Sequence, residues 1–163
     1  ALTQVAKQVM ERASLPAKWL CLEITESALM EDPELANSHL NTLAQTGVKL
    51  SIDDYGAGHA SLAYVKTLPV SELKIDRAFV SQVDQLHKNA AIVRSTLLLC
   101  RELGLSVVAE GVETASELQW LQANQCDQAQ GFYIGRPMAL EALHEWMTNY
   151  HADNVRPHME LRS

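Results

Sequence analysis

The sequence predicts an α/β fold, specifically an incomplete (β/α)8 TIM-type barrel with about five β/α units. Short apolar segments, partly β-branched, alternate with helical patterns along the chain, and this alternation is typical of a parallel sheet. Near the end of each of the first four predicted strands stands a charged residue, namely Glu23, Asp53, Lys74 and Glu110, and Gln130 follows in the fifth strand. Successive positions are separated by about one strand-plus-helix unit. Because active sites lie at the carboxyl ends of barrel strands, this placement favours a barrel over an open doubly wound sheet.

The five strands are predicted from their apolar, partly β-branched composition. They lie at about residues 19–25, 48–53, 72–76, 105–109 and 129–134. We assign residues 1–150 to the partial barrel domain and residues 151–163 to a polar C-terminal tail.

The helices are predicted from capping signals and apolar spacing, at about residues 2–14, 33–47, 88–103, 115–124 and 140–149. Asp32 precedes a helix that begins with Pro33, which is a helix-start signature. Thr114 and Glu117 have the spacing of a capping box, which marks the start of the helix predicted over residues 115–124. The faces expected to point inward are Leu2, Val5, Val9 and Met10 in the first helix and Ile92, Leu98, Leu99 and Leu103 in the 88–103 helix.

The composition excludes several classes of protein. The net charge of −7 over 163 residues argues against a nucleic-acid polymer as partner, because such binding needs a basic face. An acidic protein can still bind a phosphate ligand if metal ions lie between the carboxylates of the protein and the phosphate. The three cysteines lack a C-x-x-C spacing, so we expect buried thiols in a cytoplasmic protein. No apolar run is long enough for a bilayer, so we expect no membrane contact by this segment, although a parent protein could be membrane-anchored.

The adjacent pair Asp53-Asp54 is the sharpest chemical signal. Neighbouring strand residues face opposite ways, so only a strand end lets both carboxylates approach one site. There they can bind two hard cations at the spacing used in phosphoester hydrolysis. A solvated Asp-Asp turn is the alternative, and the loop glycines Gly56 and Gly58 favour the metal site.

Three further strand-end residues extend this pattern. Glu23 lies inside an apolar run, where burial is costly without a cation or partner. Lys74 is flanked by apolar residues, and it either orients a water and a phosphate or pairs within the barrel core. Glu110 is a base, a metal ligand or part of an exposed turn.

Five segments together carry a resemblance to a known family. In order, they are Leu22–Ser27, Ile52–Gly58, Leu73–Asp76, Val108–Glu113 and Gln130–Phe132. They resemble successive motifs of the EAL domain, a family of bacterial cyclic di-GMP phosphodiesterases with a modified TIM barrel. The resemblance implies hydrolysis of cyclic di-GMP to linear pGpG with Mg²⁺ or Mn²⁺, in second-messenger signalling.

The resemblance also implies roles for individual residues. Glu23, Asp53 and Asp54 would bind the metal ions, with Asp53 as the bridging ligand. Lys74 would hold the attacking water, and Glu110 would be a ligand or the general base.

Other residues would support the site. By the same resemblance, Glu26 would brace the loop from Asp53 to Ser61. Glu113 and Gln130 would support the site and the substrate phosphate, and Pro137 would pack near a guanine base.

The sequence departs from the family pattern at its start. The namesake Glu-Ala-Leu motif of an early strand is absent, and the literal Glu141-Ala142-Leu143 belongs to a C-terminal amphipathic helix. We therefore expect this chain alone to be weak or inactive. The alternative function is a degenerate, non-catalytic module that binds cyclic di-GMP or a protein. Because five parallel strands leave two unpaired edges, we also expect a homodimer or strand-exchanged self-association.

Overall fold

The structure is a computed structural model that describes residues 2–56 and 62–155. Its centre is one parallel sheet in the order β1-β2-β3-β4-β5. The strands are β1 (Cys21–Thr25), β2 (Lys49–Tyr55), β3 (Glu72–Ile75), β4 (Ser106–Ala109) and β5 (Gln128–Ala129). The predicted α/β class with five β/α units is therefore confirmed.

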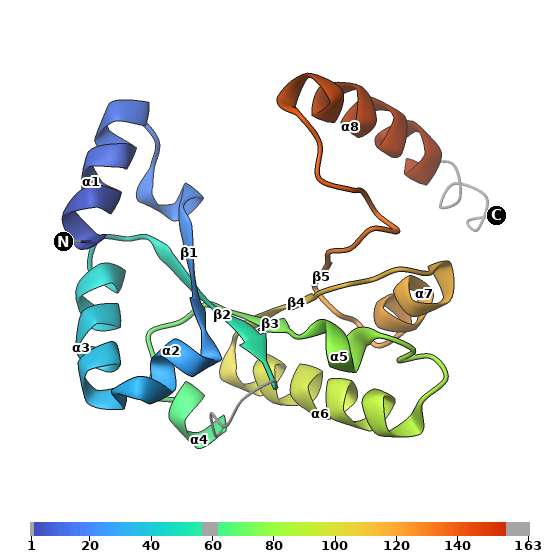
Figure 1. The fold of residues 1–163 in the computed structure, drawn as a ribbon, viewed down its shortest axis with the longest axis horizontal. Coiled ribbons are helices and arrows are strands. Elements are labelled where there is room, and N and C mark those ends of the chain that lie inside the picture. Colours follow the sequence, from blue (N-terminus) through green and yellow to red (C-terminus); the bar gives the residue numbers. More distant parts are fainter. Residues whose placement is uncertain (1, 57–61, 156–163) are drawn as a thin grey trace.

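One helix and a 3-10 turn precede β1, and helices then follow each strand. They are α1 (Leu2–Ala13), the 3-10 turn η1 (Ala17–Trp19), α2 (Glu26–Glu31), α3 (Pro33–Ala44), α4 (Leu62–Val65), α5 (Arg77–Val80), α6 (His87–Leu103), α7 (Ala115–Ala123) and α8 (Leu140–Val155). Figure 1 shows α2, α4, α5 and α6 below the sheet, whereas α8 lies above it at the end of an extended segment that follows β5. None of the helices in the described part of the chain is long and apolar enough to cross a bilayer.

Local signals fix the helix ends as the sequence predicts. The Asp32 side chain accepts a hydrogen bond of 3.1 Å from Leu35 N at the start of α3. Thr114 and Glu117 form the reciprocal capping box of α7. Gly104 ends α6 in the left-handed conformation, with φ 71°, which glycine adopts at little cost.

The core lies between the sheet and the helices below it. Leu50 and Ile52 of β2 and Leu73 and Ile75 of β3 are buried there. Since side chains alternate along a strand, the residues between them project to the opposite face. Lys74 is one of these, and it leads to the site described below.

The C-terminal elements differ from the prediction in their limits. The strand predicted over 129–134 is wrong, because β5 has two residues and the chain then turns. In this turn Ile134 N and Gly135 N each donate a 3.0 Å hydrogen bond to Gly131 O. Helix α8 continues past the expected end near 149 to Val155. Residues 156–163 of the predicted tail lie outside the described residues, and the domain boundary near residue 150 stays a prediction.

The inward face of α6 was also predicted wrongly. Ile92 and Leu98 are 42% and 60% exposed, and the buried residues of this helix are Val93, Thr96, Leu97 and Cys100. The predicted inward face of α6 and the face that is buried are both largely apolar in sequence, so the position of the sheet decides which of the two faces is covered. In α1, Val5 and Val9 are exposed and Ala6 is buried, whereas Met10 is partly buried and packs against the core as expected. Of the cysteines, Cys21 is exposed rather than buried, because it begins the edge strand β1.

Candidate functional site

Lys74 is the centre of an ion cluster at the carboxyl ends of the strands. Its Nζ lies 2.7 Å from Glu110 Oε1, 3.0 Å from Glu23 Oε1 and 3.1 Å from Asp53 Oδ1. The Lys74 side chain is 7% exposed, so the ammonium is largely removed from water. Four consecutive strand ends thus bring predicted site residues to one place.

Electrostatics in this cluster favour the charged lysine. Burial by itself lowers the pKa of Lys74, but its interactions with the carboxylates of Glu110, Glu23 and Asp53 outweigh this effect, and the pKa is raised. Burial also raises the pKa of Glu110; Lys74 opposes that shift, and Asp53 and Asp54 add repulsion. The site therefore holds more negative charge than one lysine can offset.

Asp53, Asp54 and Glu110 form a group able to hold a metal ion. Each offers one carboxylate oxygen, and these oxygens lie within 4.8 Å of one another. Burial, followed by repulsion from Asp53 and Asp76, raises the pKa of Asp54. Among the described residues, no group donates a well-directed hydrogen bond to the buried Oδ1 of Asp53, although Lys74 Nζ lies 3.1 Å away. Crowded carboxylates of this kind fit a hard divalent cation.

Glu26 lies at the first position of α2 and is buried. Its Oε2 accepts a 2.9 Å hydrogen bond from Gly56 N, directly after β2. Gly56 has φ 103°, and a Cβ there would approach Phe79 to 2.5 Å. Glu26 thus holds the start of the segment that follows Asp53 and Asp54. The rest of the predicted loop, including Gly58 and Ser61, lies outside the described residues.

Glu113 is not part of the Lys74 cluster. Its Oε1 pairs with Arg77 Nη2 at 2.7 Å, and the aliphatic part of Arg77 packs over Gly111. Glu113 therefore links α5 to the segment after β4, and its role in supporting the site and the substrate phosphate stays a prediction.

Sequence reasoning gave Glu117 only a capping role. Glu117 is 4% exposed, and its carboxylate accepts hydrogen bonds from Gln82 N, Glu113 N and Thr114 N at 2.8, 2.9 and 3.0 Å. The bond to Gln82 joins the loop after α5 to the first turn of α7, which is distant in sequence. A capping box predicts the bond to Thr114, but no sequence signal indicates the bond to Gln82.

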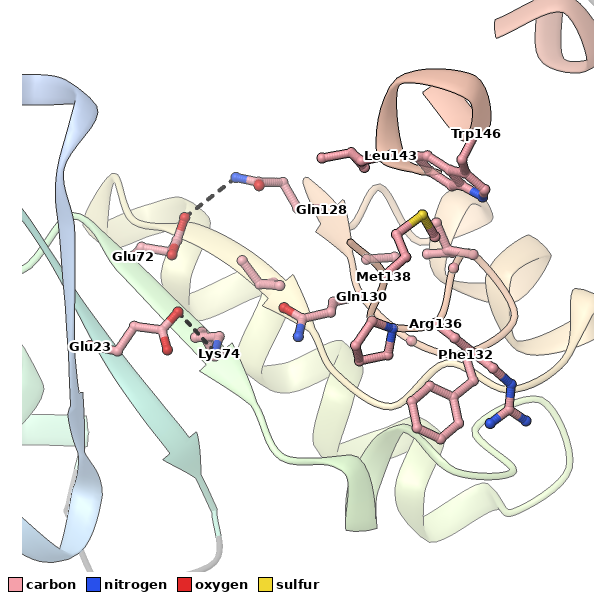
Figure 2. A pocket seen from close by; sticks show the side chains of 16 residues that line it. Glu23, Glu72, Lys74, Gln128, Gln130, Phe132, Arg136, Met138, Leu143 and Trp146 are labelled. Carbon is pink, nitrogen blue, oxygen red and sulfur yellow. Dashed lines mark hydrogen bonds and ion pairs between the residues drawn. The ribbon is translucent and has the colours of Figure 1, made fainter. Parts of the chain in front are cut away.

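Gln130 and Pro137 line a cavity of about 630 Å³ that also includes Glu23 and Lys74. Figure 2 shows the Gln130 side chain projecting toward Lys74, with Glu23 paired to the lysine. Helix α8 supplies Trp146 to the far wall. Glu141, from the literal Glu-Ala-Leu segment, is exposed on α8 and does not line this cavity.

Comparison with known proteins gives a consistent result. A family model described as the EAL domain matches residues 1–137. NbdA of Pseudomonas aeruginosa, named a cyclic di-GMP phosphodiesterase, is 39% identical over 157 residues, which cover 96% of this chain and 20% of NbdA.

Solved structures agree with the sequence match. The MucR phosphodiesterase of Pseudomonas aeruginosa in complex with c-di-GMP is 44% identical, with a TM-score of 0.79 over 84% of this chain and 56% of that chain. A manganese and cyclic di-GMP complex of Klebsiella pneumoniae BlrP1 is 32% identical, with a TM-score of 0.78 over 83% of this chain and 34% of that chain. This chain spans about a fifth of the length of the curated relatives.

Proposed function

Because this chain belongs to the EAL domain family, we propose that it is part of a cyclic di-GMP phosphodiesterase. The proposed reaction is metal-dependent hydrolysis of one 3′–5′ phosphodiester of cyclic di-GMP, which gives linear pGpG. The observation that carries the proposal is the group of Asp53, Asp54 and Glu110, whose ligand oxygens lie within 4.8 Å of one another beside Lys74.

Mg²⁺ or Mn²⁺ is the proposed cofactor, since carboxylate oxygens suit hard divalent cations. Asp53, Asp54 and Glu110 would hold the ion. Glu23 lies beside them and pairs with Lys74. A bound ion of this kind supplies a more acidic water and positive charge for the phosphodiester.

The chain's own residues would bind and orient the reactants. Lys74 pairs with Glu23, Asp53 and Glu110, and one of its three N–H donors would turn from these carboxylates to the attacking water. Glu110, with its raised pKa, would accept the proton of that water or act as a ligand.

Residues further from the lysine would position substrate. Gln130 and Pro137 would contact it within the shared cavity. Glu26 and Glu113 would brace the segments that carry Asp54 and Glu110.

Calorimetric titration with Mn²⁺ tests the metal site directly. We expect Asp53→Ala to abolish tight Mn²⁺ binding, whereas Glu141→Ala, which removes an exposed carboxylate of α8, leaves it unchanged. Chromatographic detection of pGpG then tests the reaction, for which we expect slow turnover by this chain. Turnover that survives Asp53→Ala would contradict the site.

A non-catalytic cyclic di-GMP-binding module is the second candidate. One observation favours it. Glu23 Oε1 pairs with Lys74 Nζ at 3.0 Å, and Glu23 does not belong to the group of three carboxylates that could hold a metal ion. A sensor of this kind should bind cyclic di-GMP in EDTA with undiminished affinity. Loss of binding in EDTA supports the phosphodiesterase.

A further inference from the structure

The short helix α5 lies between the two segments that carry the proposed metal ligands. It follows β3 directly, with Asp76 as its cap residue. Because β3 lies between β2 and β4 in the sheet, a helix that follows β3 emerges between the ends of these two neighbours. Asp54 lies near the end of β2, and Glu110 comes directly after β4. The position of α5 can therefore influence both carboxylates.

On the β2 side, α5 contacts Gly56 through Phe79. Gly56 follows β2 with φ 103°, and a Cβ there would approach Cε2 of Phe79 to 2.5 Å. The ring thus lies directly against the backbone of Gly56, which has no side chain to separate them. From another direction, Gly56 N donates a 2.9 Å hydrogen bond to Glu26 Oε2. Phe79 and Glu26 together fix the backbone that follows Asp54.

On the β4 side, α5 contacts Gly111 through Arg77. Gly111 directly follows Glu110 and has φ 71°, and a Cβ there would clash with Cβ, Cγ and Cδ of Arg77. The aliphatic stem of Arg77 thus lies against the backbone beside Glu110. Its guanidinium pairs with Glu113 at 2.7 Å, but the Arg77 side chain is 62% exposed, so this pair contributes little stability by itself. Its effect is to direct the stem across Gly111.

The rest of the fold keeps α5 in place. Val80, at the end of the helix, is fully buried in the core. Asn89 of α6 donates hydrogen bonds from Nδ2 to Ala78 O at 3.2 Å and to Ser81 O at 2.9 Å. The helix is therefore anchored on one side by the core and by α6, and it presents Phe79 and Arg77 to the two glycines on the other.

A metal site of this kind depends on the separation of its ligands. The ligand oxygens of Asp53, Asp54 and Glu110 lie within 4.8 Å of one another, and like charges so close repel each other. Support from the surrounding chain must oppose this repulsion until an ion binds. Phe79 and Arg77 touch the backbone beside these carboxylates, so they can place the ligands without binding the ion themselves.

We propose that α5 sets the separation of Asp54 and Glu110, and that Phe79 and Arg77 are positioning residues of the metal site. This inference rests on the proposed function, because it assumes that these carboxylates bind the ion of that reaction. It goes beyond the brace formed by Glu26, which acts on the β2 side alone.

A double-mutant cycle tests the β2 side, by Mn²⁺ calorimetry on the full 163-residue chain. We expect Phe79→Leu and Gly56→Ala each to weaken Mn²⁺ binding about tenfold. The double variant should bind about fivefold more tightly than the product of the two losses predicts, because leucine leaves room for the alanine methyl group. The backbone strain of alanine is common to both backgrounds and cancels. Losses that simply multiply would overturn the inference, and Phe79→Met replaces Phe79→Leu if the latter does not fold.

Two substitutions of Arg77 test the β4 side. Arg77→Ala should weaken Mn²⁺ binding about tenfold, whereas Arg77→Lys, which keeps an aliphatic stem and a positive charge, should remain within about threefold of the parent chain. An equal loss in both variants would overturn the inference.

Leu43→Ala is the control for a loss of packing alone, because it removes a buried side chain of α3. Its melting temperature in EDTA should fall while its Mn²⁺ affinity stays unchanged, and the same melts verify that the other variants are folded. If Leu43→Ala loses as much Mn²⁺ affinity as Phe79→Leu, packing in general is the cause and the inference is wrong.

Detection of pGpG separates this inference from the proposed function. Mn²⁺ binding that depends on Phe79 and Arg77, in a chain that never produces pGpG, would uphold the inference and reject the proposed hydrolysis. Hydrolysis with equal Mn²⁺ affinity in all variants would do the reverse. A parent chain with no measurable Mn²⁺ affinity would also overturn the inference.

Discussion

The carboxylates of Asp53 and Asp54 approach one another although the two residues are neighbours in strand β2. Asp54 has a left-handed backbone, with φ 56°, and the pairing of β2 with β3 shifts between Ile52 and Tyr55. Regular strand geometry would direct the two side chains to opposite faces, and an irregularity of this kind re-aims one of them. The backbone conformation at Asp54 is therefore needed, together with the two side chains, to bring both carboxylates to one site.

We expect Asp54→Gly and Asp54→Ala to differ in stability while both lose Mn²⁺ affinity. The left-handed region disfavours alanine, so Asp54→Ala should unfold with a free energy about 1 kcal/mol lower than Asp54→Gly. Urea denaturation and Mn²⁺ calorimetry provide the two measurements. Asp54→Asn is the control, because asparagine tolerates this backbone. An alanine variant as stable as the glycine variant would contradict the argument.

Replacement of Lys74 by methionine should destabilise the fold in the absence of metal. Asp53 and Glu110 would lose their buried cation, and the free energy of unfolding should fall by roughly 3 kcal/mol. Added Mn²⁺ should recover part of this loss, since it offsets the same charges. Lys66→Met removes an exposed lysine and is the control. Equal stability of the two variants in EDTA would count against the role of Lys74.

The hydrogen bonds of Glu117 predict a specific pH dependence of stability. Burial raises its pKa, but the bonds from Gln82, Glu113 and Thr114 outweigh this, and the pKa lies below its usual 4.5. A lowered folded-state pKa stabilises the protein above the unfolded-state pKa, and this stabilisation is lost as the pH falls through the folded-state pKa.

The free energy of unfolding of Glu117→Gln should therefore be about 2 kcal/mol lower than that of the parent chain at pH 7. The difference should narrow as the pH falls below 4.5 and through the lowered folded-state pKa, where the carboxylate of the parent chain becomes protonated. Urea denaturation between pH 3 and pH 7 measures the difference. Glu102→Gln, at an exposed position of α6, should show no comparable change. A difference that is constant with pH would show that charge plays no part.

Self-association is expected from the edges of the sheet. In the described part of the chain, β1 and β5 each pair on one side only, and Trp19 next to β1 is highly exposed. Unpaired strand edges are templates for pairing with another chain. Light scattering should detect a dimer or larger species, and Cys21→Lys, which places a charge on the edge, should reduce it. A monodisperse monomer would refute this expectation.

Most of the sheet could be predicted from the sequence because its signals are local. The runs that form β1 to β4 are apolar and β-branched, and each ends near a charged residue. The predicted 129–134 strand was wrong since Gly131 packs on the backbone of Val112 and the chain turns there. That contact depends on a segment distant in sequence, so no local pattern indicates it.

In the site, too, local signals could be recognised in the sequence, whereas contacts between distant segments could not. Glu23, Asp53, Lys74 and Glu110 could be placed together because the carboxyl ends of parallel strands meet at one edge. Glu117 was recognised as a helix cap, yet its bond to Gln82 N spans 35 residues. The contact of Arg136 with Phe132 could not be predicted for a similar reason, since it arises from the turn after β5.

The order of the strands in space equals their order along the chain. During synthesis on the ribosome, each new strand can therefore add to the strand that emerged just before it, without waiting for a distant partner. Domains generally fold as units while synthesis proceeds from the N-terminus. Among the described strands β5 adds last, so the segment that carries Gln130 and Pro137 reaches a sheet on which the acidic residues have already come together.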